Sequence, residues 1–222
     1  MTDPAHHALY AVLAPAVAFV LLALNAPIRR EGRAAGYVSI GFSAVSLLNA
    51  IWAWRKIEPG VFHPPLIWEW IPAEARPLAT VGVLADADST IMLCLVALVA
   101  FLVQVYSLGY LDTEPAPALG RYYCYQSLFA FSMMGLVLAP NFLQLFICWE
   151  LVGLCSYLLI GYWYQRPAAA RAAVKAFGRR RRGTSGSSWA SSGCGGRRAR
   201  STSSRSCRWS SPGACLPRGW AS

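Results

Sequence analysis

A single carboxylate stands out in the apolar stretch 141–164, NFLQLFICWELVGLCSYLLIGYWY. The stretch is long enough to cross a bilayer, and Glu150, near its middle, is its only acid. An ionisable side chain at membrane depth is costly, and where one is kept it commonly faces a polar path or a charged partner. Because the affinity of a buried carboxylate for a proton falls when a Lys or Arg approaches, Glu150 is a candidate proton-relay residue.

The alternative is that Glu150 only helps helices to pack, hydrogen-bonded inside a bundle. Three nearby side chains could then satisfy it: Gln144, Cys148 and Ser156. A relay, in contrast, needs a basic residue in another membrane helix. The two lysines of the chain, Lys56 and Lys175, both fall outside the predicted spans.

Other site chemistry finds little support in the sequence. The seven cysteines form no CxxC pair, and the three histidines do not combine with them into a metal-ligand spacing. There is no phosphate loop, dinucleotide fingerprint or Ser/His/Asp pattern. We therefore expect no metal and no cofactor bound by this chain.

Hydropathy predicts an all-α transmembrane protein with five spans. Hydrophobic residues make up 56% of the chain, and its mean hydropathy is +0.40. The predicted spans are 8–28, 37–54, 90–108, 122–139 and 141–164. Between the second and third, residues 55–87 are rich in proline and acids, with short apolar runs typical of a hairpin on the membrane surface.

Basic residues predict the orientation of these spans. Arginines follow the first span at positions 29, 30 and 33, and Arg166, Arg171 and Lys175 follow the fifth. With five spans the two groups fall on one side, which the positive-inside rule assigns to the cytoplasm. The N-terminus is then outside, in a multi-pass protein of the cell inner membrane.

The formal charge of +10 comes entirely from the end of the chain. Up to residue 177, ten basic residues balance ten acids, whereas 178–222 contain ten arginines and no acid. We interpret this as a disordered basic tail, and we expect lipid but no nucleic acid as a partner of the rest of the chain. A metal module in the tail is excluded by the absence of paired cysteine spacing.

The run 121–177 resembles subunit L of bacterial NADH-quinone oxidoreductase, the respiratory complex I, which is an antiporter-like subunit. The residues that carry the resemblance are the aromatic-rich start RYYCYQ, then LVLA followed by Asn141, then WELVGLCSYLLIG and the KAF at 175–177. YSLGYL at 106–111 also fits, and the likeness is weak before residue 85. Pro140 stands where the family often has an acid.

The resemblance implies proton translocation coupled to NADH-to-quinone electron transfer in other subunits. Glu150 matches the family's fifth-helix glutamate, which works with a lysine on a later helix. The implied partners are the other membrane subunits of complex I, and NADH, flavin, iron–sulfur clusters and quinone belong to those other subunits. The nearest alternative is the large subunit of a multisubunit cation/proton antiporter.

The tail also fits a frameshift. If residues 183–194 are read one base earlier with TCN serine codons, each step into a serine encodes Phe, Leu, Ile or Val, and the step from Trp189 to Ala190 encodes Gly. The recovered pattern resembles the family's sixth helix, which begins Gly-Asp-Val-Gly. We therefore expect a truncated chain that is inactive as translated. A short membrane protein with a lipid-binding basic tail is the alternative.

These predictions divide the chain into three parts. Residues 1–120 hold three leading helices with the outer loop at 55–87. Residues 121–177 begin the antiporter-like repeat with the fourth and fifth helices. Residues 178–222 form the out-of-frame tail.

Overall fold

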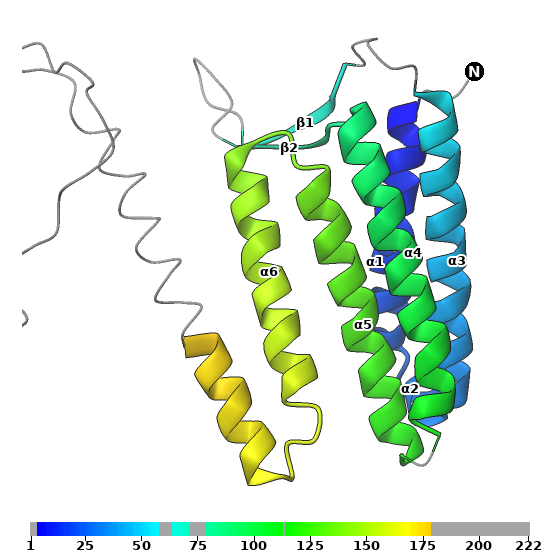
Figure 1. Cartoon of the computed structure of the whole chain (residues 1–222), viewed down its shortest axis with the longest axis vertical. Coiled ribbons are helices and arrows are strands. Elements are labelled where there is room, and N and C mark those ends of the chain that lie inside the picture. The colour runs from blue at the N-terminus through cyan, green and yellow to red at the C-terminus, as the bar shows by residue number, and fades with distance from the viewer. Residues whose placement is uncertain (1–3, 58–63, 72–78, 113, 179–222) are drawn as a thin grey trace, which may run out of the picture. The chain divides into compact units, whose positions relative to one another are not determined.

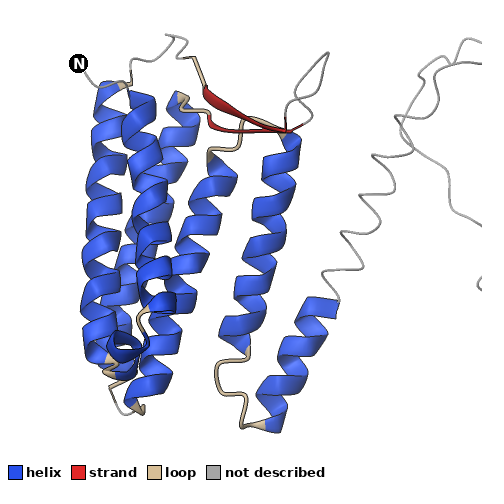
Figure 2. Cartoon of the chain, turned by 180° about the vertical axis from the view of Figure 1, so that it is seen from behind, coloured by secondary structure: helices blue, strands red, loops and turns tan. Residues whose placement is uncertain are grey.

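A computed structural model describes residues 4–57, 64–71, 79–112 and 114–178 of the chain (Figure 1). Long helices run side by side, and a two-stranded hairpin lies across one end of them (Figures 1 and 2). The elements are α1 (Pro4–Leu24), α2 (Ala26–Arg30), α3 (Arg33–Lys56), β1 (Leu66–Ile71), β2 (Ala79–Val83), α4 (Ala87–Tyr110), α5 (Ala116–Val137) and α6 (Phe142–Ile160). A further helix covers 167–178. The predicted tail lies outside the described residues, apart from Gly178.

The first predicted span, 8–28, is shifted in the structure. Helix α1 ends at Leu24, and the short helix α2 begins at Ala26 with Pro27 in its first turn. Proline lacks an N–H and its ring clashes with the carbonyl four residues earlier, so Pro27 favours a break here, whereas α1 accommodates Pro15 in its interior. The fifth predicted span is likewise shorter, because the chain turns at residues 161–166 after Ile160.

Small and polar residues form the helix contacts at a 3–4 spacing. In α3 the buried positions include 36, 39, 43, 46, 50 and 53, all Gly, Ser or Ala. Buried positions of α4 repeat in the same way at 90, 93, 97, 100, 104 and 107. This spacing averages 3.5 residues and turns one narrow face of a helix toward its neighbour. Small side chains there let helix backbones approach closely, as in membrane bundles.

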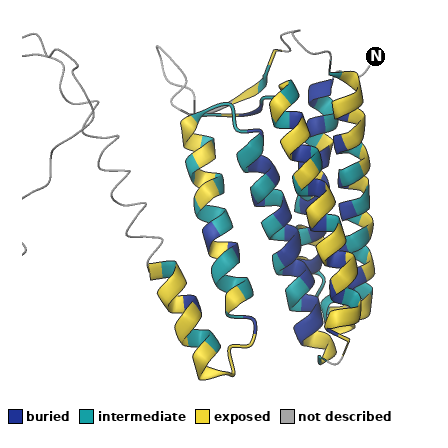
Figure 3. Cartoon of the chain, viewed as in Figure 1, coloured by how far each residue is buried: buried dark blue, intermediate teal, exposed yellow. Residues whose placement is uncertain are grey.

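Helix α5 lies at the centre of the bundle, packed against α1, α2, α3, α4 and α6. Half of its 22 residues are buried (Figure 3). Large apolar side chains are exposed on α1, α3, α4 and α6, where lipid would meet them, and none is exposed on α5. A helix enclosed by others does not need an apolar surface, so it can carry more polar residues.

The all-α membrane fold predicted from hydropathy is confirmed, but the number of five spans is not. Among the described residues, α1, α3, α4 and α6 are long and apolar enough to cross a membrane, with mean hydropathies of 2.2, 1.5, 2.5 and 1.9. Helix α5 has 22 residues, which at 1.5 Å per residue make about 33 Å and are long enough to cross a membrane. It is not apolar enough, however, to count among the candidate spans. Its central position accounts for this difference.

The predicted hairpin is present. Strands β1 and β2 pair antiparallel, with Leu66 opposite Val83 and Ile67 opposite Gly82. The hairpin contacts the bundle through Val83. Val83 and Ala85 are buried among residues of α1, α3, α4 and α5 that lie at the same end of the bundle. We refer to this end of the bundle as the hairpin end and to the opposite one as the α2 end.

Charged residues distribute unevenly between the two ends. The α2 end holds six arginines and three acids among the described residues: Arg29, Arg30, Arg33, Arg121, Arg166 and Arg171, with Glu31, Asp112 and Glu114. Arg33 and Asp112 form an exposed ion pair. The arginines that follow α1 and those that follow α6 therefore share one end, as the predicted topology requires.

Candidate functional site

Helix α6 holds Glu150 near its middle, eight residues after its start and ten before its end. Asn141 begins the helix as its N-cap, because its side-chain Oδ1 accepts a hydrogen bond at 2.8 Å from the backbone N–H of Gln144. Gly161 forms the C-cap. At 1.5 Å per residue, Glu150 lies about 12 Å and 15 Å from the two helix ends, so it is at mid-membrane depth if α6 spans.

Two carboxamides fix the start of α6 to the hairpin. The Gln144 side chain accepts from the Gly82 N–H at 2.8 Å and donates to the Gly82 carbonyl at 2.9 Å. Asn141 Nδ2 donates to the Thr80 carbonyl at 2.6 Å and to its hydroxyl at 2.8 Å. The Gly82 N–H and carbonyl and the Thr80 carbonyl point away from β1. The two carboxamides therefore cover a strand edge of β2 that would otherwise be unpaired. We call the contact of Asn141 and Gln144 with Thr80 and Gly82 the carboxamide clamp.

Glu150 lies on the side of α6 that faces away from α5. Cys148 and Cys155 mark the side that faces α5, since Cys148 lies against Gly135 and Cys155 Sγ is 4.0 Å from Ser132 Oγ. At 100° per residue, Glu150 is about 200° around the helix from Cys148. Of the nineteen residues of α6, all of them described, only Gly153 and Cys155 are buried, and Glu150 itself is half-buried.

The proposed packing partners of Glu150 are engaged elsewhere. Gln144 holds the hairpin, and Ser156 Oγ donates to the Val152 carbonyl at 2.9 Å. Cys148 faces α5 rather than the Glu150 side. Within the part of the chain that the structure describes, no hydrogen bond or ion pair joins Glu150 to another residue. The structure therefore does not support a local packing role through these three side chains.

Lys175, a basic residue near α6 in the sequence, does not point toward it. The helix 167–178 packs on α6 through Ala173, whose Cβ lies 3.5 Å from where a Cβ of Gly161 would be, and through the ring pair Tyr157–Phe177 at 5.4 Å. Lys175 is exposed and about 200° around its helix from Ala173. The helix does lie on the same side of α6 as Glu150, two turns away at Tyr157.

A buried polar cluster inside the bundle was not predicted from the sequence. Ser39 Oγ donates to Gln104 Oε1 at 3.1 Å and lies 2.8 Å from Ser127 Oγ, which joins α3, α4 and α5. Gln104 is only 1% exposed. Such interhelical hydrogen bonds hold membrane helices together. The 3–4 spacing of small and polar residues in α3 and α4 was the signal that could have revealed it.

No metal centre accompanies these groups. In the described ranges, no three His, Cys, Asp or Glu side chains lie close enough together to hold a metal ion. The free cysteines 94, 124, 148 and 155 are not paired in disulfides.

Comparison with protein families defines the class of this fold. Residues 139–186, which contain Glu150, match the family described as NADH:quinone oxidoreductase/Mrp antiporter, TM. The structure of the Mrp complex from Dietzia sp. DQ12-45-1b contains a similar chain, with a TM-score of 0.59 and 30% sequence identity. That match covers 75% of this chain and 17% of the Mrp chain. The fold is thus that of the antiporter-like membrane subunits.

Within that class the likeness is to one subunit of complex I. Residues 70–123 match the family NADH-Ubiquinone oxidoreductase (complex I), chain 5 N-terminus. NAD(P)H-quinone oxidoreductase subunit 5 of the Marchantia polymorpha chloroplast is 40% identical over 171 residues, 74% of this chain and 24% of that protein. Chain 5 of the Synechocystis enzyme is 45% identical over 134 residues, 60% of this chain and 19% of that protein.

These matches confirm the resemblance to antiporter-like subunits of complex I. Residues 70–123 match the N-terminal segment of that family and residues 139–186 match its antiporter-like membrane segment. It spans about a quarter or less of the length of the curated relatives that it matches. The family match ends at residue 186, close to residue 183, where the alternative reading frame described above begins.

Proposed function

We propose that this chain is part of a membrane subunit of NADH-quinone oxidoreductase that takes part in proton translocation, with Glu150 as the proton-relay residue. The observation that carries the proposal is the placement of Glu150: a lone carboxylate at the middle of an apolar helix of spanning length, on the side that faces away from α5, within the segment that matches the antiporter family. A carboxylate retained at that depth needs a proton or a partner.

The position of Glu150 on the side of α6 away from α5 supports the expected arrangement of the site. A relay carboxylate must meet a basic group whose distance to it changes, and such a group has to approach from the side that α5 does not occupy. Further helices packed on that side would bring it. Other membrane subunits of the complex are the partners we propose, and the redox cofactors would be bound outside this chain.

The remaining parts of the proposal concern topology and the tail. The N-terminus would lie outside the cell inner membrane, and the arginine-rich α2 end in the cytoplasm. Residues 1–120 would be the leading helices, 121–177 the start of the translocating repeat and 178–222 an out-of-frame tail, which would leave the translated chain inactive. Resequencing the gene across Lys175 to Gly186 tests the tail, and an uninterrupted frame encoding the same tail would refute the frameshift.

The relay role is tested in the restored full-length subunit within the assembled complex. Glu150→Gln keeps the size of the side chain but cannot ionise, so we expect proton pumping in membrane vesicles to be lost while the complex assembles normally. Glu31→Gln, at the α2 end, removes a carboxylate outside the spans and should leave pumping unchanged. Retained pumping in the Glu150→Gln complex would reject the relay role.

A second candidate is a subunit of a cation/proton antiporter. It is favoured by the similar chain of the Dietzia Mrp complex, which shares 30% identity. The match of residues 70–123 to complex I chain 5 favours the first candidate. The flanking genes separate them: genes for complex I subunits would support the oxidoreductase, and genes for small antiporter subunits would support the antiporter.

A further inference from the structure

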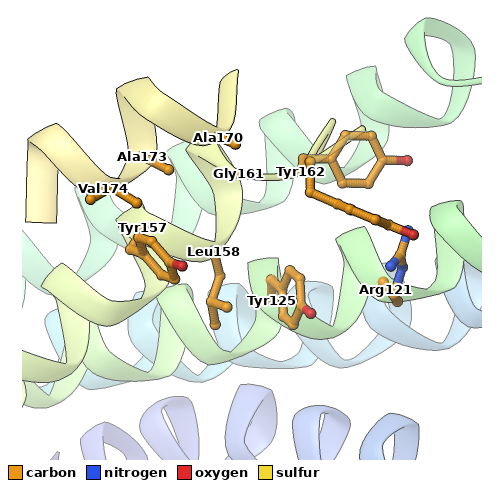
Figure 4. A pocket seen from close by; sticks show the side chains of 10 residues that line it. Arg121, Tyr125, Tyr157, Leu158, Gly161, Tyr162, Ala170, Ala173 and Val174 are labelled. Carbon is orange, nitrogen blue, oxygen red and sulfur yellow. The ribbon is translucent and has the colours of Figure 1, made fainter. Parts of the chain in front are cut away.

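A pocket of about 200 Å³ opens at the α2 end, between the start of α5, the end of α6 and the helix 167–178 (Figure 4). Arg121 and Tyr125 line it from α5, and Tyr157 and Leu158 line it from α6. Small and branched apolar residues of the third helix complete it: Ala170, Ala173 and Val174. The pocket therefore has a basic group at one side and an apolar wall at the other.

The polar groups of this pocket lack anionic or hydrogen-bonding partners. The half-buried Arg121 guanidinium lies over the Tyr164 ring, 5.2 Å from its centroid, and no carboxylate of the described residues is within ion-pair distance of it. Tyr162, 8% exposed, also lines the pocket, and its buried hydroxyl has no hydrogen-bond partner among the described groups. The Tyr162 hydroxyl is not accessible from the pocket, so the Arg121 guanidinium is the polar group that a bound anion would meet.

Tyr162 forms part of the pocket wall. Burial raises the pKa of its phenol above the usual value, Glu114 raises it further, and Arg121 opposes both effects. The hydroxyl therefore keeps its proton at physiological pH. Its ring packs edge-on against Tyr122 and Trp163, at 5.8 Å and 5.3 Å, which fixes its place in the pocket wall.

The position of the pocket at the level of the lipid headgroups indicates what kind of molecule it could bind. Tyr162, Trp163 and Tyr164 directly follow the end of α6, and aromatic side chains of this kind sit at the level of lipid headgroups. A molecule held there would place an anionic group at Arg121 and hydrocarbon against the apolar wall. Phosphate offers the acceptor oxygens that a guanidinium prefers.

We propose that this pocket binds one anionic phospholipid, with its phosphate at Arg121 and its acyl chains along Tyr157, Leu158 and Val174. The excess of arginine over acid at this end of the bundle favours an anionic lipid over a zwitterionic one. The proposal is independent of proton translocation, because none of these residues takes part in the relay proposed for Glu150.

The full chain can be tested in nanodiscs of phosphatidylcholine doped with a small fraction of phosphatidylglycerol. After release into detergent, native mass spectrometry measures how much of each lipid stays bound. We expect phosphatidylglycerol to be retained preferentially, and Arg121→Gln to reduce its retention about tenfold, the effect of losing one charge-assisted hydrogen bond. Arg121→Lys, which keeps the charge, should retain an intermediate amount.

Arg171→Gln is the matched control, since Arg171 lies at the same end but outside the pocket and its guanidinium Nε donates to the Pro167 carbonyl at 3.1 Å. It should leave lipid retention unchanged. Equal losses in Arg121→Gln and Arg171→Gln would show diffuse attraction to charge and overturn the proposal. So would equal retention of both lipids, or full displacement of phosphatidylglycerol by millimolar inorganic phosphate, which would identify free phosphate as the ligand.

Discussion

Two substitutions of Asn141 can separate the two roles of this residue in the carboxamide clamp, the cap of α6 and the bonds to Thr80 of the hairpin. Asn141→Ala removes the N-cap acceptor and both bonds to Thr80. Losing a cap costs about 1 kcal/mol, and each of the two other bonds contributes about 1 kcal/mol, so the local loss should be about 3 kcal/mol. Asn141→Asp keeps the acceptor for the Gln144 N–H but has no donor for Thr80, so it should lose about 2 kcal/mol.

Hydrogen exchange of individual amides in nanodiscs measures both parts of this contact. In Asn141→Ala the Gln144 N–H should exchange about fivefold faster, because the cap that it loses contributes about 1 kcal/mol and 1.4 kcal/mol corresponds to a factor of ten. In Asn141→Asp that amide should stay protected, while the Gly82 N–H, which Gln144 holds, should exchange faster in both variants. Equal exchange of the Gln144 amide in the two variants would refute the cap. An unchanged Gly82 amide in both would refute the clamp.

Two substitutions test contacts inside the bundle. Gly120→Ala would place a Cβ against the backbone carbonyl of Arg29, which cannot move aside as a side chain can, so the thermal unfolding midpoint in detergent should fall with a loss of about 1–3 kcal/mol. Gly109→Ala, where a Cβ meets open space, is its control, and equal midpoints would contradict the close approach. Gln104→Leu removes the acceptor of the Ser39 hydroxyl inside the bundle and should cost about 1 kcal/mol. An unchanged unfolding midpoint would show that this bond does not hold the helices together.

Several features of the fold were predictable because they depend on local chemistry. Each residue of a helix that meets lipid must be apolar and its backbone must be bonded within the helix, so span length and hydropathy are readable from a window of the chain. That is why α1, α3, α4 and α6 were found. The hairpin was found for a similar reason, since short apolar runs between turn residues are typical of strands.

Two details of the fold were missed for different reasons. The break between α1 and α2 follows a local signal, Pro27, but hydropathy alone does not register a missing N–H. The polar cluster of Ser39, Gln104 and Ser127 joins three helices over as many as 88 positions, so the 3–4 spacing marks the helix faces but not which residues meet across them.

By itself the sequence determined that this is a helical membrane protein with one carboxylate, Glu150, in the middle of an apolar helix. This is possible because each residue that faces lipid must be apolar, and that requirement can be read from the local sequence. Only the tertiary structure decided that α5 is the enclosed helix. It also decided that Gln144 is bonded to the hairpin and that Glu150 faces away from α5. These facts depend on which helix occupies which side of another, and that is set by contacts between residues far apart in the chain.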